Sequence, residues 1–263
     1  GNDFVIIDQR SQNYNLTKDQ IIKICDRNFI GCDQLIFIQK SEEKDAGLEF
    51  YNSDGSISGA CGNGTRCVAD LLSKENSDKE IILWTTSGAL KSQILGNNSV
   101  ETEIGIAKTN WNEIPLNKNL DTKNLNIKIV NKNNIEHIGG TCVNVGNPHV
   151  VFFVDNIEDY DLKKIGPEIE NHNYFPEKCN VTLAKVISKK LIKVKVWERG
   201  AGLTKACGTA ACATAVAANI NGLTDKKTDI EFALGNLSIT IDQNNSIHMK
   251  GPVSDITNIE INI

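Results

Sequence analysis

The chain has 263 residues, of which 40% are hydrophobic and 23% charged, proportions typical of a globular protein with a substantial core. Its net charge of −5 at pH 7, with no cluster of basic residues, argues against a nucleic-acid-binding protein. Its longest apolar runs, such as residues 150–154, are too short to cross a bilayer, which argues against a membrane protein.

The eight cysteines and four histidines show no metal-binding pattern. No two cysteines have the Cys-x-x-Cys spacing of zinc sites, and the histidines are isolated from one another. The chain begins at Gly1 rather than at Met and shows no export leader, so we expect a few residues to precede it. We therefore expect a cytoplasmic protein with no metal and no disulfide scaffold, in which most cysteines are small buried hydrophobic residues.

The first half of the chain predicts strands arranged around two helices. Residues 4–8 predict a strand, and the capping-box pair Thr17 and Gln20 predicts a helix that runs to Phe29. A second helix is expected at residues 62–72, after a turn at residues 54–55. The remaining strands are expected at residues 35–38, 48–51, 81–85, 89–95 and 100–104.

The second half repeats this order of elements. A strand is predicted at residues 150–154 and a helix at residues 161–171. Residues 208–218 are apolar on nearly every side, which predicts a buried central helix. Residues 117–134, rich in Asn and Lys, predict an exposed connector with an edge strand. The remaining strands are expected at residues 181–187, 191–197, 230–234, 237–241 and 247–249.

The two halves also share a sequence pattern at an offset of 146 residues. The sequence ACGNG at residues 60–64 recurs as ACGTA at residues 206–210. Three further pairs lie in the same order: Gln34 and Asn180, Asn52 and Glu198, and residues 1–4 (GNDF) and 146–149 (GNPH).

These matched positions predict an α+β fold of two pseudo-symmetric domains that arose by internal duplication. Each domain is expected to be a strand-rich sheet wrapped around a central helix. We expect an N-terminal lobe over residues 1–115 and a C-terminal lobe over residues 116–252. A last strand, at about residues 253–263, is expected to pack back on the N-terminal lobe.

Cys61 and Cys207 each stand directly before a predicted helix. At such a position unpaired backbone N–H groups and the helix dipole stabilise a thiolate, and the same N–H groups can bind a carboxylate. Two thiols on opposite faces of one substrate carbon could remove and return a proton as a coupled pair. A single cysteine of this kind is more often a packing residue, and it is the duplication that favours catalysis.

Two titratable residues occur in the second copy only. Glu198 stands where the first copy has Asn52, and His149 stands where it has Phe4. They could poise one cysteine as thiolate and the other as thiol. Two structural alternatives are equally open, namely a local ion pair of Glu198 with Arg199 and a buried core histidine.

These motifs resemble the diaminopimelate epimerase family over nearly the whole chain. The resemblance rests on GNDF at residues 1–4, Asn52 with CGNGTRC at residues 61–67, GNPH at residues 146–149 and ERGAGLTKACGT at residues 198–209. It implies a pyridoxal-independent, cofactor-free enzyme that interconverts L,L- and meso-diaminopimelate for lysine and peptidoglycan synthesis. Proline racemase-like enzymes share the fold but typically have Cys-Gly-His at the first motif, where this chain has Cys-Gly-Asn.

Carried over by position, the resemblance implies that Cys61 and Cys207 are the acid and base, exchanging roles with the direction of reaction, and that His149 and Glu198 tune them. It implies substrate contacts at Asn2, Gln34, Asn52, Gly62, Asn63, Asn147, Asn180, Glu198, Arg199, Gly208 and Thr209.

The chain departs from the family pattern at two positions. Ala210 stands where the family often has glycine. Thr257 stands where relatives often carry an aromatic residue linked to the dimer contact, which weakens the homodimer that the resemblance implies.

Four other functions stay open from the sequence alone: another cofactor-independent racemase of the same superfamily, a pyridoxal-dependent racemase, a two-lobed amino-acid binding protein, and a thiol–disulfide switch that uses the same two cysteines.

Overall fold

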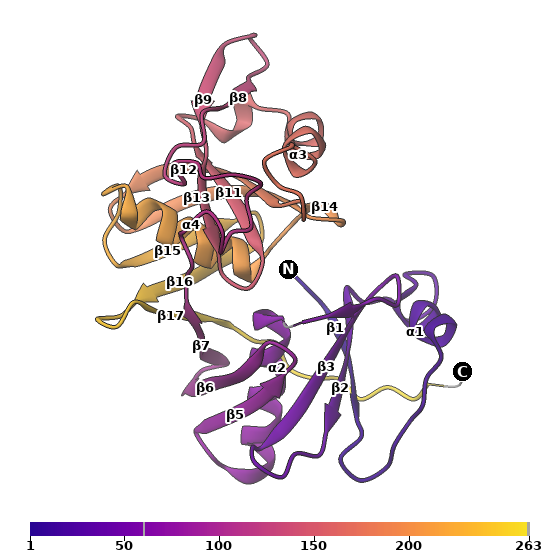
Figure 1. Cartoon of the computed structure of the whole chain (residues 1–263). Helices are drawn as coiled ribbons and strands as arrows, with labels where there is room; N and C mark the ends of the chain where they lie inside the picture. The colour runs from indigo at the N-terminus through magenta and orange to yellow at the C-terminus, as the bar shows by residue number, and fades with distance from the viewer. Residues whose placement is uncertain (60, 262–263) are drawn as a thin grey trace. The chain divides into compact units, whose positions relative to one another are not determined.

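The computed structural model describes residues 1–59 and 61–261, and the chain divides into two compact units (Figure 1). The N-terminal unit consists of Asn2–Glu103 and the end of the chain from Lys250, and the C-terminal unit consists of Gly1 and Ile104–Met249. The chain passes from one unit to the other inside strand β7 (Ser99–Ile106), not at the predicted boundary after residue 115. Among the described residues, no helix has the length and apolar character needed to cross a membrane.

The N-terminal unit is a mixed sheet with the strand order β1-β2-β3-β5-β6-β7, and β4 pairs with β3. Strands β1 and β2 are parallel and are joined through helix α1, while β3 and β5 are parallel and are joined through helix α2. The elements before β7 are β1 (Phe4–Asp8), α1 (Lys18–Cys25), β2 (Gln34–Gln39), β3 (Ala46–Asn52), β4 (Ile57–Ser58), α2 (Gly62–Asn76), β5 (Glu80–Thr85) and β6 (Gly88–Gly96).

The C-terminal unit repeats this scheme, with the strand order β17-β16-β15-β13-β12-β11-β10. Strands β11 and β12 are parallel around α3, and β13 and β15 are parallel around α4. The elements are β10 (Thr141–Asn144), β11 (Pro148–Phe153), η1 (Ile157–Asp159), α3 (Leu162–Glu170), β12 (Asn180–Ser188), β13 (Leu191–Glu198), β14 (Gly202–Thr204), α4 (Gly208–Ile220), β15 (Lys227–Phe232), β16 (Gly235–Ile241) and β17 (Ser246–Pro252).

A separate hairpin of β8 (Ile127–Val130) and β9 (Glu136–Gly139) lies in the connector between the two repeats. The expected edge strand in this connector corresponds to β8. Its partner β9 follows a turn in which Asn131 Oδ1 accepts hydrogen bonds from the backbone N–H groups of Asn133 and Ile135. This turn folds the Asn-rich segment back on itself, so the connector contains a hairpin rather than a single strand.

Strand register shows the duplication directly. Phe4 lies opposite Gln34 in the β1–β2 pair, and His149 lies opposite Asn180 in the β11–β12 pair. The positions matched in sequence therefore occupy the same places in the two sheets. The predicted duplicated α+β fold is confirmed.

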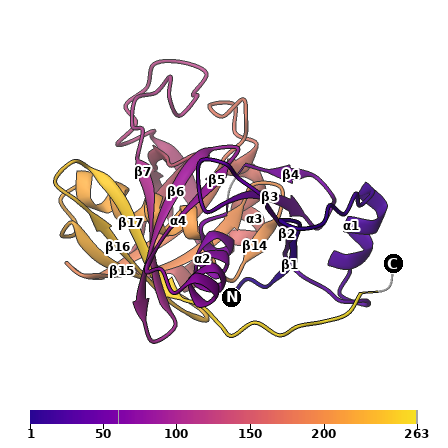
Figure 2. The ribbon, with the colours of Figure 1, turned by 90° about the horizontal axis from the view of Figure 1, so that it is seen from below.

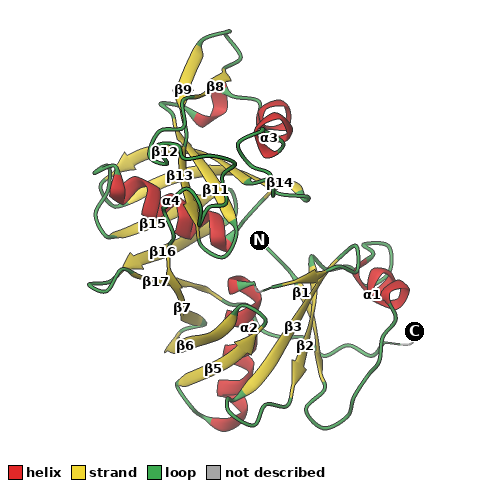
Figure 3. Ribbon diagram, in the orientation of Figure 1, coloured by secondary structure: helices red, strands yellow, loops and turns green. Residues whose placement is uncertain are grey.

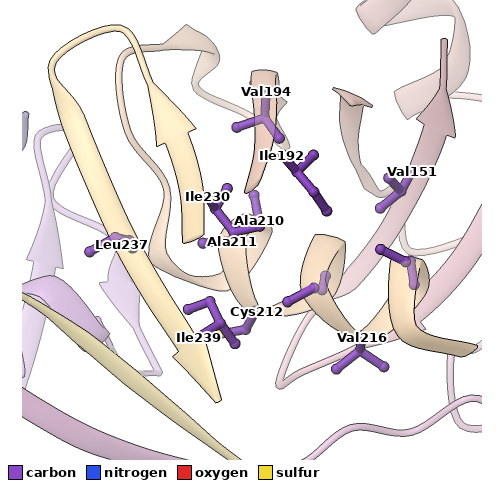
Figure 4. Close-up of a cluster of buried hydrophobic side chains, with 14 of the residues drawn as sticks. Val151, Ile192, Val194, Ala210, Ala211, Cys212, Val216, Ile230, Leu237 and Ile239 are labelled. Carbon is purple, nitrogen blue, oxygen red and sulfur yellow. The ribbon is translucent and has the colours of Figure 1, made fainter. Parts of the chain in front are cut away.

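The central helix of each unit is buried against its own sheet. Every residue from Ala210 to Ala218 in α4 is buried, and Figure 4 shows strand residues such as Ile192 and Ile239 around it. Alanine dominates this helix, and its small side chain lets the strands approach from several sides. Helix α2 packs on β5 and β6 (Figure 3) and, unlike α4, buries two charged residues, Arg66 and Asp70.

Two predicted elements need correction. Both bonds of the Thr17–Gln20 capping box are present, but α1 ends at Cys25 rather than at Phe29, because Asp26 is extended and its side chain accepts from the N–H of Asn28. The last strand, expected at about residues 253–263, does not form at residues 253–261, since β17 ends at Pro252, which has no N–H to continue a ladder; residues 262–263 lie outside the described residues. Residues 253–261 run toward α1 (Figure 2), with Val253 and Ile261 packed on clusters of the N-terminal unit.

Candidate active site

Cys61 is the N-cap of α2 and has an extended backbone, with φ −140°. Its carbonyl oxygen accepts from the N–H of Thr65 at 2.8 Å and from the Thr65 hydroxyl at 2.9 Å, which fixes the first turn. The thiol is partly buried. The residue before it in the repeated motif, Ala60, lies outside the described residues.

The predicted substrate-binding amides of the N-terminal unit form two hydrogen-bonded pairs. Asn63, in the first turn of α2, donates from Nδ2 to Asn2 Oδ1 at 2.6 Å, and Asn2 in turn donates to Asp33 at 3.0 Å. Gln34 Nε2 donates to Asn52 Oδ1 at 2.9 Å across the β2–β3 pair. The structure therefore brings these four residues together in two pairs near the strand ends and the start of α2.

Arg66 is a charged residue of this region that is not among the predicted site residues. Its side chain runs back along α2, where Nη2 donates to Asn63 Oδ1 at 2.9 Å and Nη1 lies 3.4 Å from the Gly62 carbonyl oxygen. It is only 4% exposed, so a buried guanidinium adds positive charge at the start of the helix. The duplication provides a signal for it, because the same offset of 146 places neutral Cys212 at the corresponding position of α4.

Cys207 is the N-cap of α4 and repeats the position of Cys61. Its sulfur accepts from the N–H of Ala210 at 3.4 Å and lies 3.4 Å from the Thr209 hydroxyl. Cys207 is only 5% exposed and belongs to the core around α4, whereas Cys61 is partly buried.

The predicted lowering of the thiol pKa at a helix start is wrong for Cys207. Burial raises the pKa of this thiol well above its ordinary value, and the Glu198 carboxyl group raises it further. The hydrogen bonds from Thr209 and Ala210 lower the pKa but do not offset the other two effects. At neutral pH the Cys207 side chain is therefore a thiol rather than a thiolate.

The Glu198 side chain is fixed by the hairpin that follows it. Glu198 is the last residue of β13 and pairs with Gly202 of β14. Its Oε1 accepts from the Thr204 hydroxyl at 2.5 Å. The carboxyl group is thus positioned by two strands of the same unit that carries Cys207.

His149 is fully buried in β11, as the core-histidine alternative requires. Its Nε2 lies 2.8 Å from Asn147 Oδ1, which ties the ring to another predicted site residue. Burial, with a smaller effect of the Arg199 charge, lowers the pKa of His149 to about 3. The imidazole is therefore neutral at pH 7 and brings no charge to the site.

Asn180 connects two of the predicted site segments. Its Oδ1 accepts from the backbone N–H of Arg199 at 3.0 Å, and its Nδ2 donates to the Pro148 carbonyl oxygen at 3.0 Å. The Arg199 guanidinium donates from Nη1 to the Glu177 carbonyl oxygen at 2.8 Å. Asn180 thus holds the segments before His149 and after Glu198 to one another.

The predicted site residues fall into two groups at equivalent places in the two units. The N-terminal unit holds Cys61, Gly62, Asn63, Asn2, Gln34 and Asn52, and the C-terminal unit holds Cys207, Gly208, Thr209, Asn147, His149, Asn180, Glu198 and Arg199. In the part of the chain that the structure describes, no group of three or more His, Cys, Asp or Glu side chains is placed to hold a metal ion.

The chain is similar in sequence to diaminopimelate epimerases. The family model described as "Diaminopimelate epimerase" matches residues 1–109 and 141–256. A diaminopimelate epimerase of Pelagibacter ubique is 76% identical over the whole chain and 96% of its own length. A second, of Phenylobacterium zucineum, is 42% identical over 97% of this chain and 92% of its own length.

Solved structures with the same fold are much more distant in sequence. A protein of Pseudomonas aeruginosa described as a predicted epimerase superposes with a TM-score of 0.70 at 14% identity, over 99% of this chain and 93% of its own. A probable proline racemase of Agrobacterium radiobacter with bound carbonate gives 0.60 at 9% identity, over 89% of this chain and 77% of its own. At these identities the likeness establishes the fold alone.

Proposed function

Because this chain belongs to the diaminopimelate epimerase family and is a pyridoxal-independent isomerase of diaminopimelate, we propose that Cys61 and Cys207 are its acid and base. The reaction interconverts the L,L and meso forms by inverting one α-carbon. One sulfur removes the α-proton from one face, and the other delivers a proton to the opposite face. Neither cysteine acts on substrate alone, and their roles exchange when the reaction runs in reverse.

The observation that carries this proposal is the structural equivalence of the two cysteines. Each is the N-cap of the central helix of its unit, in an extended backbone conformation, and each is followed by glycine. Inversion by proton transfer needs a base on one face of the carbon and an acid on the other, and because the reaction is reversible each group must serve in both roles. A duplicated helix start supplies such a pair.

The two helix starts differ in charge, and this difference supports a division of labour in the resting enzyme. Arg66 adds a buried cation to the start of α2, which favours an anion there. Cys207 lies beside the Glu198 carboxyl group, which disfavours an anion on its sulfur. We therefore assign Cys207 as the resting thiol and Cys61 as the resting thiolate.

The same two helix starts are proposed to bind substrate carboxylates. The first N–H groups of α2 and α4, at Gly62 and Gly208, have no partner within their own helices, and such groups at a helix start can bind an anion. We propose that the Arg199 guanidinium binds a carboxylate of the substrate and that Glu198 binds an ammonium group. This pair suits a substrate with an amino-acid group at each end. The amides of Asn2, Gln34, Asn52, Asn63, Asn147 and Asn180 and the Thr209 hydroxyl complete the proposed polar set.

The known contributions to enzymatic rate acceleration show how much the site must supply beyond acid–base transfer. An N–H donor aimed at charge that develops in the transition state stabilises it by about 3–4 kcal/mol. General acid–base transfer adds roughly 10²- to 10⁴-fold in rate. Because enzymatic accelerations are typically about 10⁶-fold or more, we propose that exclusion of water from the bound substrate supplies much of the remainder.

We also propose that the enzyme is cytoplasmic and forms a homodimer. Free cysteines throughout the described residues fit a reducing compartment. The dimer follows from the family resemblance alone and is measured directly by light scattering of the full chain after size-exclusion chromatography.

The test of the cysteine pair is the loss of epimerisation in Cys61→Ala and in Cys207→Ala. Cys212→Ala is the matched control, since it removes a buried thiol from the same helix as Cys207. We expect both single variants to be inactive under reducing conditions and the control to retain activity. Full activity of either single variant, or a preparation that is more active when oxidised than when reduced, contradicts the proposal and favours the thiol–disulfide alternative.

A further inference from the structure

The turn that carries Glu198 and Arg199 has little stiffness of its own. The N–H of Ala201 donates to the Glu198 carbonyl oxygen at 3.1 Å, which closes a tight turn. Gly200 and Gly202 both adopt left-handed backbone conformations, with φ +76° and +83°. Glycine gives the chain this geometry but also the greatest conformational freedom. The pairing of β13 with β14 holds Glu198 at the base of the turn, and the position of Arg199 and Gly200 at its tip depends on groups outside the hairpin.

Glu170, the last residue of α3, supplies such groups on both sides of the turn. Its Oε2 accepts from the indole Nε1–H of Trp197 at 2.7 Å, and its Oε1 accepts from the backbone N–H of Gly200 at 3.0 Å. Glu198 and Arg199 lie between these two anchor points in the sequence. Glu170 is 6% exposed, so the two hydrogen bonds are shielded from competing water.

Helix α3 reaches the turn because of a glycine one helical turn before Glu170. A Cβ atom at Gly166 would lie 2.4 Å from the Trp197 ring, closer than any real contact. The absence of a side chain there lets the helix lie directly on the indole. Gly166 and Glu170 are four residues apart and lie on one face of α3. This face therefore packs on the Trp197 ring at Gly166 and accepts a hydrogen bond from its indole N–H at Glu170.

We propose that Glu170 is a positioning residue of the active site, which holds Glu198 and Arg199 in their working arrangement. This inference rests on the roles proposed above for those two residues. Glu170 acts through the turn, and the substrate is touched by Glu198 and Arg199. Asn180 holds the same turn at the Arg199 N–H, so the turn has one anchor from β12 and a second, from Glu170, at the end of α3.

The chemistry of the anchor requires a carboxyl group. Both of its oxygens accept hydrogen bonds from N–H donors, whereas an amide has only one oxygen acceptor. In Glu170→Gln the amide NH₂ must therefore face either the indole N–H or the Gly200 N–H. We expect this variant to lose roughly 10- to 100-fold in kcat/KM, the size of effect that follows displacement of catalytic groups by about 1 Å.

The decisive test is rescue by a second substitution. Trp197→Phe removes the indole N–H and keeps an aromatic ring at that position. In the double variant the glutamine oxygen can accept from Gly200 while its NH₂ no longer meets a donor. We expect Glu170→Gln with Trp197→Phe to be at least several-fold more active than Glu170→Gln alone. Additive losses in the double variant contradict the proposal. Glu168→Gln, the same substitution at an exposed position of α3, is the matched control and is expected to behave as the parent.

Two measurements without substrate separate this inference from the two-cysteine mechanism. The first is the ¹⁵N–¹H signal of the Trp197 indole, one of three in the protein, assigned by its absence in Trp197→Phe. The second is trypsin cleavage after Arg199, followed by mass spectrometry. In Glu170→Gln we expect the indole signal to move and cleavage at Arg199 to accelerate, while the control leaves both unchanged.

The combined results for Glu170→Gln distinguish a positioning role from a purely structural one. A loosened turn together with reduced kcat/KM and rescue supports the proposal, whatever the cysteine variants show. A loosened turn with unchanged kcat/KM makes Glu170 a purely structural residue and overturns it. An unchanged indole signal and cleavage rate in Glu170→Gln also overturn it, even if Cys61→Ala and Cys207→Ala are both inactive.

Discussion

Arg66 Nη2 donates a hydrogen bond to Asn63 Oδ1 at 2.9 Å, and so a buried guanidinium stands at the first turn of the helix that follows Cys61. The corresponding position of α4 is Cys212, which carries no cation. In the C-terminal unit the charged group is instead Glu198, whose carboxyl group raises the pKa of the Cys207 thiol. The helix start after Cys61 therefore carries a buried cation, whereas the Cys207 thiol lies beside a carboxyl group.

Replacing Arg66 with methionine removes the cation and keeps most of the apolar stem. A partly buried charge at a helix end contributes about 1–2 kcal/mol, so we expect alkylation of Cys61 by iodoacetamide at pH 7 to slow by roughly 5- to 30-fold. The rate is measured by peptide mass spectrometry in the Cys207→Ala background. Lys74→Met removes a cation from the last turn of the same helix and is the control. Equal alkylation rates in the two variants contradict a role for Arg66.

Replacing Glu198 with glutamine removes the carboxyl group beside Cys207. Because that group raises the thiol pKa, its loss lowers the pKa, and alkylation of Cys207 should become faster at any given pH below it. The measurement is the pH dependence of Cys207 alkylation in the Cys61→Ala background. An unchanged or upward-shifted pH profile is the outcome that this account does not allow.

His149 links stability to pH. Its pKa is lowered from 6.5 to about 3 in the folded protein, so below pH 6.5 the unfolded chain binds a proton that the folded chain does not. The stability contributed by the neutral imidazole is complete above pH 6.5 and is lost as the pH falls toward 3. Between pH 6.5 and pH 5 this group alone should remove about 2 kcal/mol from the free energy of unfolding.

Urea denaturation at these two pH values measures the effect, and His149→Gln should reduce the pH-dependent difference by that amount. A variant that keeps the full pH dependence of the parent shows that other groups cause it.

Gly166 supports the anchored turn by packing alone. A methyl group there meets the Trp197 ring at 2.4 Å, so we expect Gly166→Ala to lower the free energy of unfolding by about 1–3 kcal/mol, as overpacking of a core does. The comparison is Gly47→Ala, where a Cβ would meet nothing closer than 3.6 Å. Thermal unfolding of the two variants should therefore separate them, and an equal melting temperature refutes the tight contact.

Much of this architecture is local and could be predicted from the sequence. The Thr17–Gln20 capping box marks the start of α1, and the repeated positions predict the duplication because they recur in the same order. The end of α1 was harder to predict, because the apolar period continues to Phe29 while the backbone turns at Asp26. The hydrogen bond that the Asp26 side chain accepts from the N–H of Asn28 decides that boundary, and hydrophobic periodicity does not report it.

The electrostatics of the site depend on tertiary structure and were predicted less well. Position before a helix predicts a lowered thiol pKa, but Cys207 lies in a core that the sequence pattern does not delimit. Glu170 lies outside every repeated motif, and its two partners are 27 and 30 residues away along the chain. Contacts of this kind depend on the packing of α3 on β13, which no local pattern specifies.

The central claim is tested most directly by one turnover of unlabelled L,L-diaminopimelate in D₂O, with product and remaining substrate analysed separately. A mechanism with two thiols predicts one deuterium at the inverted α-carbon of every product molecule and none in the unreacted substrate, because the proton delivered comes from a thiol that has exchanged with solvent. Product that retains the original proton, or substrate that gains deuterium at the same rate, contradicts the pair.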